Sequence, residues 1–267
     1  MHLRTSENAR FMRTLCVIPA RMGSTRFPGK PLATLLGLEL LVHIYKRCKL
    51  CSTLDEVIIA TCDNEIKRIA EAHGAAVIMT ADSHPGCVDR TVEAVSLSKF
   101  DLDDDDLILM VQGDEVLVNP EMIEDVVKTY EKTKASVVNL ASRILDPEEL
   151  ADPDVVKVVA TPDGRALFFS RSAIPSRVRN ENGNFLALQQ TGVIGFSKKF
   201  LYKFGRLDRT PLEEIECIDM LRTLEHCYPI QIVITENETI GVDTPADRDR
   251  AEEALRKDSF TKTYMSN

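Results

Sequence analysis

Short apolar runs alternate with amphipathic stretches along most of the chain. Runs of four to six residues rich in β-branched side chains predict buried strands, and apolar side chains at helical spacing predict helices between them. We expect strands at 15–18, 57–61, 76–79, 107–111, 136–141, 191–196 and 230–235. We expect helices at 38–50, 64–73, 90–98, 122–134, 199–204, 212–225 and 246–257, with Asp63 as the N-cap of the second. This alternation indicates an α/β protein with a mostly parallel sheet.

The middle of the chain breaks the alternation. Strands expected at 155–160 and 166–170 flank Pro162-Asp163-Gly164, which predicts a hairpin. We interpret 143–196 as a β-rich insertion that covers a site or pairs subunits. Residues 1–13 are polar and aperiodic and predict a flexible extension. Residues 14–258 then form a single domain, and 259–267 form a tail.

A cationic loop follows the first expected strand. Pro19 ends that strand, and the next eleven residues hold Arg21, Arg26 and Lys30 together with Gly23 and Gly29. Ligands of α/β proteins collect at the carboxyl ends of strands, so three cations on a glycine-containing loop favour a polyphosphate site. The alternative is a solvated basic loop. The spacing of its glycines and lysine is not that of a Walker A loop, which argues against an ordinary ATPase.

Two aspartates also follow expected strands in glycine-containing turns. Asp114 lies in Gln112-Gly-Asp-Glu115, and Asp243 lies in Gly241-Val-Asp-Thr-Pro245. If these turns converge, two hard carboxylate ligands with open positions suit Mg²⁺. The alternative for each alone is a turn aspartate that bonds its own backbone.

Composition narrows the class of protein. The 267 residues carry a formal net charge of -9, which argues against nucleic acid as the main partner and leaves the basic loop as a local pocket for a small anion. The longest apolar runs are too short to span a bilayer, and residues 1–12 lack the apolar region of a signal peptide, so we expect a cytoplasmic protein with no membrane partner. Its seven cysteines form no paired framework, as is typical of reduced thiols.

Several segments resemble one family. Ile18-Pro-Ala-Arg-Met-Gly-Ser-Thr-Arg-Phe-Pro-Gly-Lys-Pro-Leu32 is similar to the N-terminal signature of the sugar-acid cytidylyltransferases, above all those of 3-deoxy-manno-octulosonate (Kdo). The two aspartate turns resemble the metal-binding motifs of that family. Val156-Lys-Val-Val159, Ala166–Pro175 and Pro211–Glu216 also resemble it, so that the similarity runs from about Leu15 to Leu255.

The resemblance implies a fold, a reaction and a set of residues. The fold is a three-layer, Rossmann-like nucleotidyltransferase with a mostly parallel twisted sheet, assembled as a homodimer. The reaction transfers the cytidylyl group of CTP to an acidic sugar with Mg²⁺ as cofactor, for lipopolysaccharide or a related surface glycan. Catalytic roles fall to Arg21, Lys30, Asp114 and Asp243, the two aspartates being the metal ligands. Nucleotide contacts fall to Ala20, Arg21, Gly23, Ser24, Arg26, Lys30, Thr80, Arg90 and Gln112.

The sequence leaves the family pattern where substrates are expected. Gly86-Cys-Val-Asp-Arg90 replaces Ser-Gly-Thr-[Asp/Glu]-Arg beside the nucleoside. Gln190 stands where Kdo enzymes have a histidine, and Asp219-Met220 stands where they have Glu-Gln. These changes alter the hydrogen-bonding groups of the sugar-acid pocket. Candidates for that pocket are Arg177, Arg179, Gln190 and Asp219.

Three classes of function therefore stay open. The first is a cytidylyltransferase whose substrate is Kdo, an amino-substituted Kdo or a nonulosonic acid. A second enzyme class is a nucleotidyltransferase that uses UTP or another nucleotide on a different sugar. A third class is a nucleotide-binding protein without turnover.

Overall fold

One twisted sheet carries all of the long strands. The computed structural model describes residues 11–23, 26–176, 187–237 and 239–265. Its main strands are β1 (Thr14–Pro19), β4 (Glu56–Thr61), β5 (Ala76–Met79), β6 (Leu107–Val111), β7 (Val137–Arg143), β10 (Leu188–Ser197) and β11 (Gln231–Thr235). They lie in the order β11-β7-β10-β6-β1-β4-β5. All neighbours in this order are parallel except β10, which runs antiparallel to both β6 and β7.

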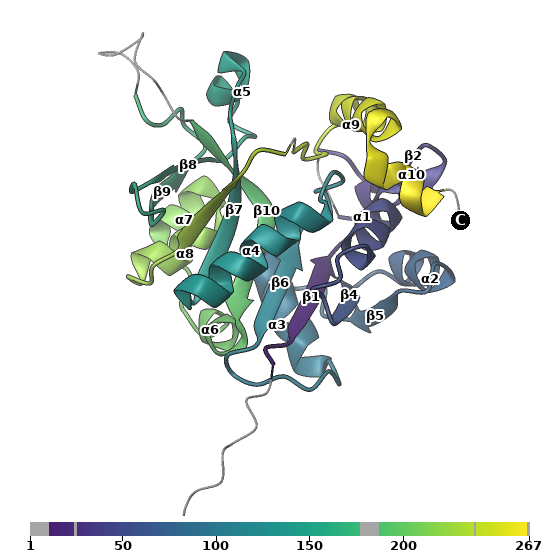
Figure 1. Ribbon diagram of the computed structural model, residues 1–267, viewed down its shortest axis with the longest axis horizontal. Coiled ribbons are helices and arrows are strands. Elements are labelled where there is room, and N and C mark those ends of the chain that lie inside the picture. Colours follow the sequence, from purple (N-terminus) through teal and green to yellow (C-terminus); the bar gives the residue numbers. More distant parts are fainter. Residues whose placement is uncertain (1–10, 24–25, 177–186, 238, 266–267) are drawn as a thin grey trace, which may run out of the picture.

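Helices cover both faces of the sheet, because the strands are apolar on both sides (Figure 1). On β1, Cys16 and Ile18 face one core, whereas Leu15 and Val17 face the other. The first core includes α1 (Leu40–Lys49), α2 (Asn64–Ala72), α4 (Pro120–Thr133) and α9 (Pro245–Lys257). The second includes α3 (Cys87–Leu97), α6 (Lys198–Phe204) and α8 (Asp219–Glu225). The expected three-layer α/β fold is confirmed.

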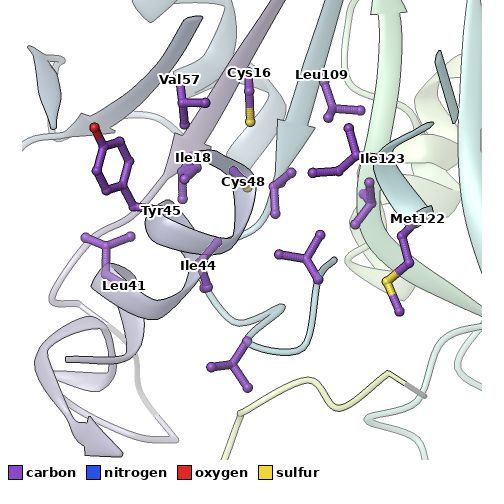
Figure 2. Close-up of a cluster of buried hydrophobic side chains, with 14 of the residues drawn as sticks. Cys16, Ile18, Leu41, Ile44, Tyr45, Cys48, Val57, Leu109, Met122 and Ile123 are labelled. Carbon is purple, nitrogen blue, oxygen red and sulfur yellow. The ribbon is translucent and has the colours of Figure 1, made fainter. Parts of the chain in front are cut away.

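The first core shows how the helical spacing of apolar residues is used. Leu41, Ile44 and Cys48 of α1 belong to the same buried cluster as Cys16 and Ile18 of β1 (Figure 2). All five side chains are fully buried. Burial of this kind contributes roughly 1.5–3 kcal/mol for each large aliphatic side chain.

The predicted hairpin is present in the middle of the chain. Strands β8 (Lys157–Ala160) and β9 (Ala166–Ser170) pair antiparallel, and β8 joins the sheet through β10. Helix α5 (Pro147–Ala151) precedes them. The last part of the segment 143–196, which we predict as an insertion, is β10 itself, and it lies inside the sheet between β6 and β7.

The prediction of one continuous helix at 212–225 is wrong. The chain forms α7 (Pro211–Glu216) and α8, separated by Cys217 in a left-handed conformation with φ 53°. The apolar spacing continues through the break, but Leu212 and Ile215 are exposed, whereas Ile218 and Leu221 are buried. Helix α3 also begins at Cys87, three residues earlier than predicted.

The expected tail contains a helix. Residues Ser259–Met265 form α10, which packs on α1, and the Tyr264 hydroxyl lies 2.6 Å from Nδ1 of the buried His43. The minor elements are the 3-10 turn η1 (Lys30–Leu32) and the two-residue strands β2 (Thr34–Leu35) and β3 (Leu38–Glu39). Within the described part of the chain, no helix has the length and apolar character that a bilayer crossing needs.

Candidate active site

A cavity of about 690 Å³ opens where the carboxyl ends of β1 and β6 meet the start of β10. The loop after β1, the turn after β6, the start of α3, the α7–α8 break and the segment before α9 all line it. Because β10 runs against β6, Gln190 and Thr191 lie beyond the end of β6 and face this cavity. The cavity is where an α/β sheet is expected to hold a ligand.

Backbone hydrogen bonds shape the cationic loop after β1. The Ala20 N–H donates to Ala60 at 2.9 Å and extends the pairing of β1 with β4. The Gly29 N–H donates to the Met22 carbonyl at 3.3 Å and closes the loop. Gly29 has φ 74°, a conformation that favours glycine, and it directly precedes Lys30 in η1. The loop therefore returns Lys30 to the sheet edge.

Lys30 joins the two predicted metal ligands. Its Nζ donates to Oδ2 of Asp114 and to Oδ1 of Asp243, each at 3.0 Å. Burial alone would lower the pKa of Lys30, but the two carboxylates outweigh burial and raise it. The two aspartates come from opposite halves of the sequence, and both reach one buried ammonium group.

The backbone around the aspartates explains this convergence. The Val242 N–H donates to the Asp114 carbonyl at 3.2 Å, and Glu115 bridges to Gly241. Asp243 directly precedes Thr244, the N-cap of α9, whose Oγ1 accepts from the Asp247 N–H at 3.2 Å. The cap fixes the start of α9, and the bridge brings the Asp243 turn against the turn after β6.

A second cation, Arg26, also binds Asp243. The Arg26 guanidinium lies 3.0 Å from Oδ2 of Asp243 and also contacts Asp154, from the loop between α5 and β8. Arg21 is exposed and lines the cavity. Arg26 and Lys30 thus stand among carboxylates that a bound polyanion would have to replace.

Glu115 is buried beneath the aspartates. Its Oε1 accepts from the Gly192 N–H on β10. Burial, followed by the neighbouring charge of Asp114, raises the pKa of Glu115 to about 7. The Gln112 N–H in turn donates to the Gly192 carbonyl at 2.9 Å, so the turn after β6 is tied to β10 on both sides of Gly192.

The opposite wall of the cavity is held by α3. Arg90 is buried and donates to Thr80 Oγ1 and to the Ala81 carbonyl, while its Nη2 has no hydrogen-bond partner among the described residues. Arg90 lines the cavity, but Thr80 does not and instead fixes the Arg90 side chain. Glu93 accepts from the Ala81 N–H at 2.8 Å and contacts His84 Nε2, which shapes the loop between them.

The break between α7 and α8 forms the far end of the cavity. Asp219 starts α8 and accepts from the Val88 N–H at 3.4 Å. Burial, followed by the neighbouring charge of Asp89, raises the pKa of Asp219 to about 6. Gln190 donates to Asn139 Oδ1 at 2.8 Å. Met220 is fully buried and also belongs to the lining of the cavity.

Most of the predicted site residues come together. Those that line the one cavity are Ala20, Arg21, Gly23, Arg26, Lys30, Arg90, Gln112, Asp114, Gln190, Asp219 and Asp243. Ser24, Arg177 and Arg179 lie outside the described residues.

Several charged residues of the lining were not predicted, among them Arg171, Asp154 and Glu115. Arg171 donates to the carbonyls of Pro153 and Glu216 and links the insertion to the α7–α8 break. It lies in the segment Ala166–Pro175 that carries the family resemblance, which was a usable signal. Glu115 lies in the turn Gln112-Gly-Asp-Glu115, which also carries the resemblance, but its contact with Gly192 is not visible in the sequence. Asp154 had no such signal, because its contact with Arg26 joins residues distant in the chain.

Cys87 also lines the cavity. Burial, followed by the charges of Asp219 and Asp114, raises the pKa of its thiol to about 12. The thiolate is the reactive form, so this shift disfavours a nucleophilic role for Cys87 at neutral pH. The chemistry of the cavity therefore rests on its cations and carboxylates.

Comparison with known proteins agrees with this geometry. Residues 15–236 match the sequence profile of the family described as Cytidylyltransferase. The chain is 39% identical over 251 residues to 3-deoxy-manno-octulosonate cytidylyltransferase of Thermodesulfovibrio yellowstonii, a match that covers 91% of this chain and 98% of that protein. It is 37% identical to 8-amino-3,8-dideoxy-manno-octulosonate cytidylyltransferase of Shewanella frigidimarina, over 92% of this chain and 100% of that protein.

A solved structure shows the same fold. It is a CMP:2-keto-3-deoxy-manno-octonic acid synthetase complexed with CTP, with a TM-score of 0.82 and 30% sequence identity over 92% of this chain and 99% of that chain. The sequence profile, the full-length relatives and the shared architecture all point the same way. This chain belongs to the cytidylyltransferase family.

Proposed function

We propose that this protein transfers the cytidylyl group of CTP to the anomeric hydroxyl of a 3-deoxy-2-ulosonic acid, Kdo or a close analogue, and releases pyrophosphate. The observation that carries the proposal is the meeting of Asp114 and Asp243 on the Lys30 ammonium, at 3.0 Å each. Relatives of nearly the same length are named for this reaction with Kdo and with its 8-amino analogue. Both names fit an acidic sugar as the second substrate.

The cationic loop is proposed to hold the triphosphate. Arg21, Arg26 and Lys30 line one side of the cavity and supply donors for phosphate oxygens. Fixed cations that face the α-phosphorus stabilise the negative charge that builds up as the hydroxyl attacks and pyrophosphate leaves. Arg26 and Lys30 pair with carboxylates in the structure, so binding of the triphosphate exchanges one set of anionic partners for another.

The residues present fit a magnesium ion. Asp114 and Asp243 place carboxylate oxygens around one ammonium group, at most twice the 3.0 Å contact distance apart, so the position already favours a cation. No cluster of three or more His, Cys, Asp or Glu ligands occurs among the described residues, which leaves room for phosphate and water as further ligands. Mg²⁺ bound there would supply positive charge to the phosphates and lower the pKa of the attacking hydroxyl.

The sugar acid is proposed to bind toward the α7–α8 break. Gln190 and Asp219 present an amide and a carboxyl group to this end of the cavity, and Arg177 stays a prediction for the same pocket. The amide at Gln190 leaves both Kdo and 8-amino-Kdo as candidates, with a nonulosonic acid as a further alternative.

The test is release of pyrophosphate. CTP, Mg²⁺ and each candidate (Kdo, 8-amino-Kdo and a nonulosonic acid) are mixed with the protein, with UTP and ATP as matched nucleotides. We expect release with CTP and at least one ulosonic acid. A rise in melting temperature with CTP but no release with any acid would favour the nucleotide-binding alternative, and turnover with UTP on another sugar would favour the second enzyme class.

We also propose a cytoplasmic homodimer that serves lipopolysaccharide or a related surface glycan. All seven cysteines are unpaired, as suits a reducing compartment. Leu145 and Leu167 of the predicted insertion are 86% and 56% exposed, which supports burial against a second copy. Light scattering after size exclusion gives the mass, and a monomer at micromolar concentration would contradict the dimer.

A further inference from the structure

Two carboxylates extend the pairing of β1 with β4 beyond both ends of the strands. Within the ladder, Leu15 pairs with Glu56 and Pro19 pairs with Ala60. At the amino end of β1, Asp55 Oδ2 accepts from the Thr14 N–H at 2.7 Å, and at the carboxyl end Asp63 Oδ2 accepts from the Met22 N–H at 2.8 Å. In each of these two hydrogen bonds the residues lie 41 positions apart, the same separation as in the ladder between β1 and β4. The two aspartates make the same bond at opposite ends of the strand.

Asp63 uses its side chain in an unusual way for its position. It is the N-cap residue of α2, but its side chain makes no capping hydrogen bond to that helix. Instead, Oδ2 accepts from Met22 and also lies 3.5 Å from the Cys62 thiol. The Asp63 N–H donates to Oγ1 of the buried Thr61 at 3.1 Å, which fixes the turn that aims the carboxylate away from α2. The side chain therefore serves the cationic loop.

The bond from Asp63 falls beside Arg21. The residue before Arg21 is tied to β4 through the Ala20 N–H, at 2.9 Å from the Ala60 carbonyl. The residue after it is tied twice, by its N–H to Asp63 and by its carbonyl to Gly29. Arg21 lines the cavity, whereas Asp63 does not. Hydrogen bonds to a charged acceptor are about twice as strong as neutral ones, so this anchor restricts the loop more than a main-chain bond would.

We infer that Asp63 is a positioning residue for nucleotide binding: its carboxylate fixes the backbone at Met22 and so preorganises Arg21 toward the triphosphate. Preorganisation lowers the ordering that ligand binding requires, and its loss weakens affinity without removing any group that touches the ligand. The inference rests on the proposed function for the identity of the ligand, CTP. Asp55 provides the matched control, because it makes the same bond at the end of β1 away from the cavity.

The experiment compares Asp63→Ala, Asp63→Asn and Asp55→Ala with the unchanged protein. It measures the KM and kcat for CTP, the Kd of CTP with Mg²⁺ by calorimetry, and amide hydrogen exchange of the peptide that contains Met22. For Asp63→Ala we expect the CTP KM and Kd to rise about tenfold, since a charge-assisted hydrogen bond is lost, with a smaller change in kcat. Asp63→Asn keeps an acceptor oxygen and should stay within about threefold. Asp55→Ala should lower the melting temperature while its CTP KM stays within about twofold.

Amide exchange separates this inference from the proposed function. Faster exchange at Met22 in Asp63→Ala, but not in Asp55→Ala, supports the anchor even if the unchanged protein does not bind CTP, a result that would refute only the proposed function. Equal effects of the two alanine variants on CTP affinity, or an unchanged KM in Asp63→Ala, would overturn the inference. If Asp63→Ala fails to fold, Asp63→Glu takes its place. It keeps the charge but moves the oxygen, so a wild-type KM in that variant also counts against the anchor.

Discussion

The carboxylates at the two ends of the cavity have different partners. At the end proposed for the triphosphate, called here the phosphate end, Asp114 and Asp243 face Lys30 and Arg26, and each acid lies within 3.0 Å of a cation. At the end proposed for the sugar acid, called here the sugar end, Asp219 makes no ion pair among the described residues and lies beside a second acid, Asp89. The nearby cation, Arg222, is already engaged by Asp89 and Glu213.

The cations at the two ends differ in whether a ligand can replace their partners. The cations at the phosphate end line the cavity, where the phosphates of a bound nucleotide would replace their carboxylate partners. At the sugar end, Arg222 is buried, donates to two acids and stacks its guanidinium 4.2 Å from the centre of the Phe204 ring. That ion network is structural, and only Asp219 remains to meet a ligand. The largest effects on turnover should therefore arise at the first end, and the largest effects on stability at the second.

Asp114→Asn should give the largest effect. It removes one of the two carboxylates proposed for Mg²⁺ and leaves the fold intact, so we expect kcat to fall by at least about 10³-fold. Removal of Mg²⁺ with EDTA should abolish turnover of the unchanged protein in the same way. Pyrophosphate release measures both, and circular dichroism checks the fold. If the variant kept a tenth of the activity, Asp114 at the phosphate end would not be a catalytic residue.

Arg222→Met tests the fixed network. The change leaves the buried Glu213 and the partly buried Asp89 without this shared cation, and breaking a buried ion pair from one side destabilises a protein by roughly 3–5 kcal/mol. The free energy of unfolding in urea measures the effect. The matched control is Arg209→Met, since Arg209 also pairs with Glu213, at 3.4 Å, but is 46% exposed. Because the Arg209 end of this longer contact is open to solvent, its loss should cost about 1 kcal/mol or less, so equal losses in the two variants would contradict a structural role for the buried network.

Local sequence patterns indicate the phosphate end of the cavity more completely than the sugar end. The cationic loop and the two aspartate turns were predictable because glycine and proline fix local geometry, and because each segment directly follows an apolar strand. The α7–α8 break was not, because Leu212, Ile215, Ile218 and Leu221 keep a helical spacing through Cys217. What the spacing does not show is the tertiary contact between the two helices, in which Arg222 of α8 donates to the buried Glu213 of α7.

Asp63 and Asp154 show the same limit within the candidate site. Asp63 was predictable as the residue before α2, but its acceptor role depends on Met22, which lies 41 residues away. Asp154 contacts Arg26 across the cavity, and no local pattern in the sequence indicates this contact. Residues whose roles arise from pairs distant in the chain need the structure to reveal them.

The titration of Asp219 gives a prediction about pH. Its folded pKa of about 6 lies above the usual value of 3.8, since burial and the charge of Asp89 oppose ionisation. Between these two pH values the unfolded chain ionises first, so this group lowers stability as pH rises toward 6, and the loss is complete above it. Asp219→Asn should thus gain about 2 kcal/mol relative to the unchanged protein between pH 4 and pH 7. Urea unfolding at both pH values measures it.

The control for this prediction is the exposed Asp208. Asp208→Asn should change stability by less than about 0.5 kcal/mol at either pH. If Asp219→Asn differed from the unchanged protein by the same amount at pH 4 and pH 7, the fold would not raise the pKa of Asp219. The contrast with the carboxylates of the phosphate end would then be wrong.

Gln190→His should have the smallest effect, and one confined to the sugar end. Gln190 lines the cavity and donates to Asn139, which is fully buried and donates in turn to the carbonyls of Leu140 and Thr191. A histidine is the residue that the family resemblance leads us to expect here in Kdo enzymes. It replaces an amide by an imidazole, which should change the ratio of kcat/KM for Kdo to that for 8-amino-Kdo by about tenfold. The CTP KM should stay the same, because the phosphate end is untouched. A change in the CTP KM with an unaltered ratio would mean that Gln190 serves the nucleotide, and would place the boundary between the two ends elsewhere.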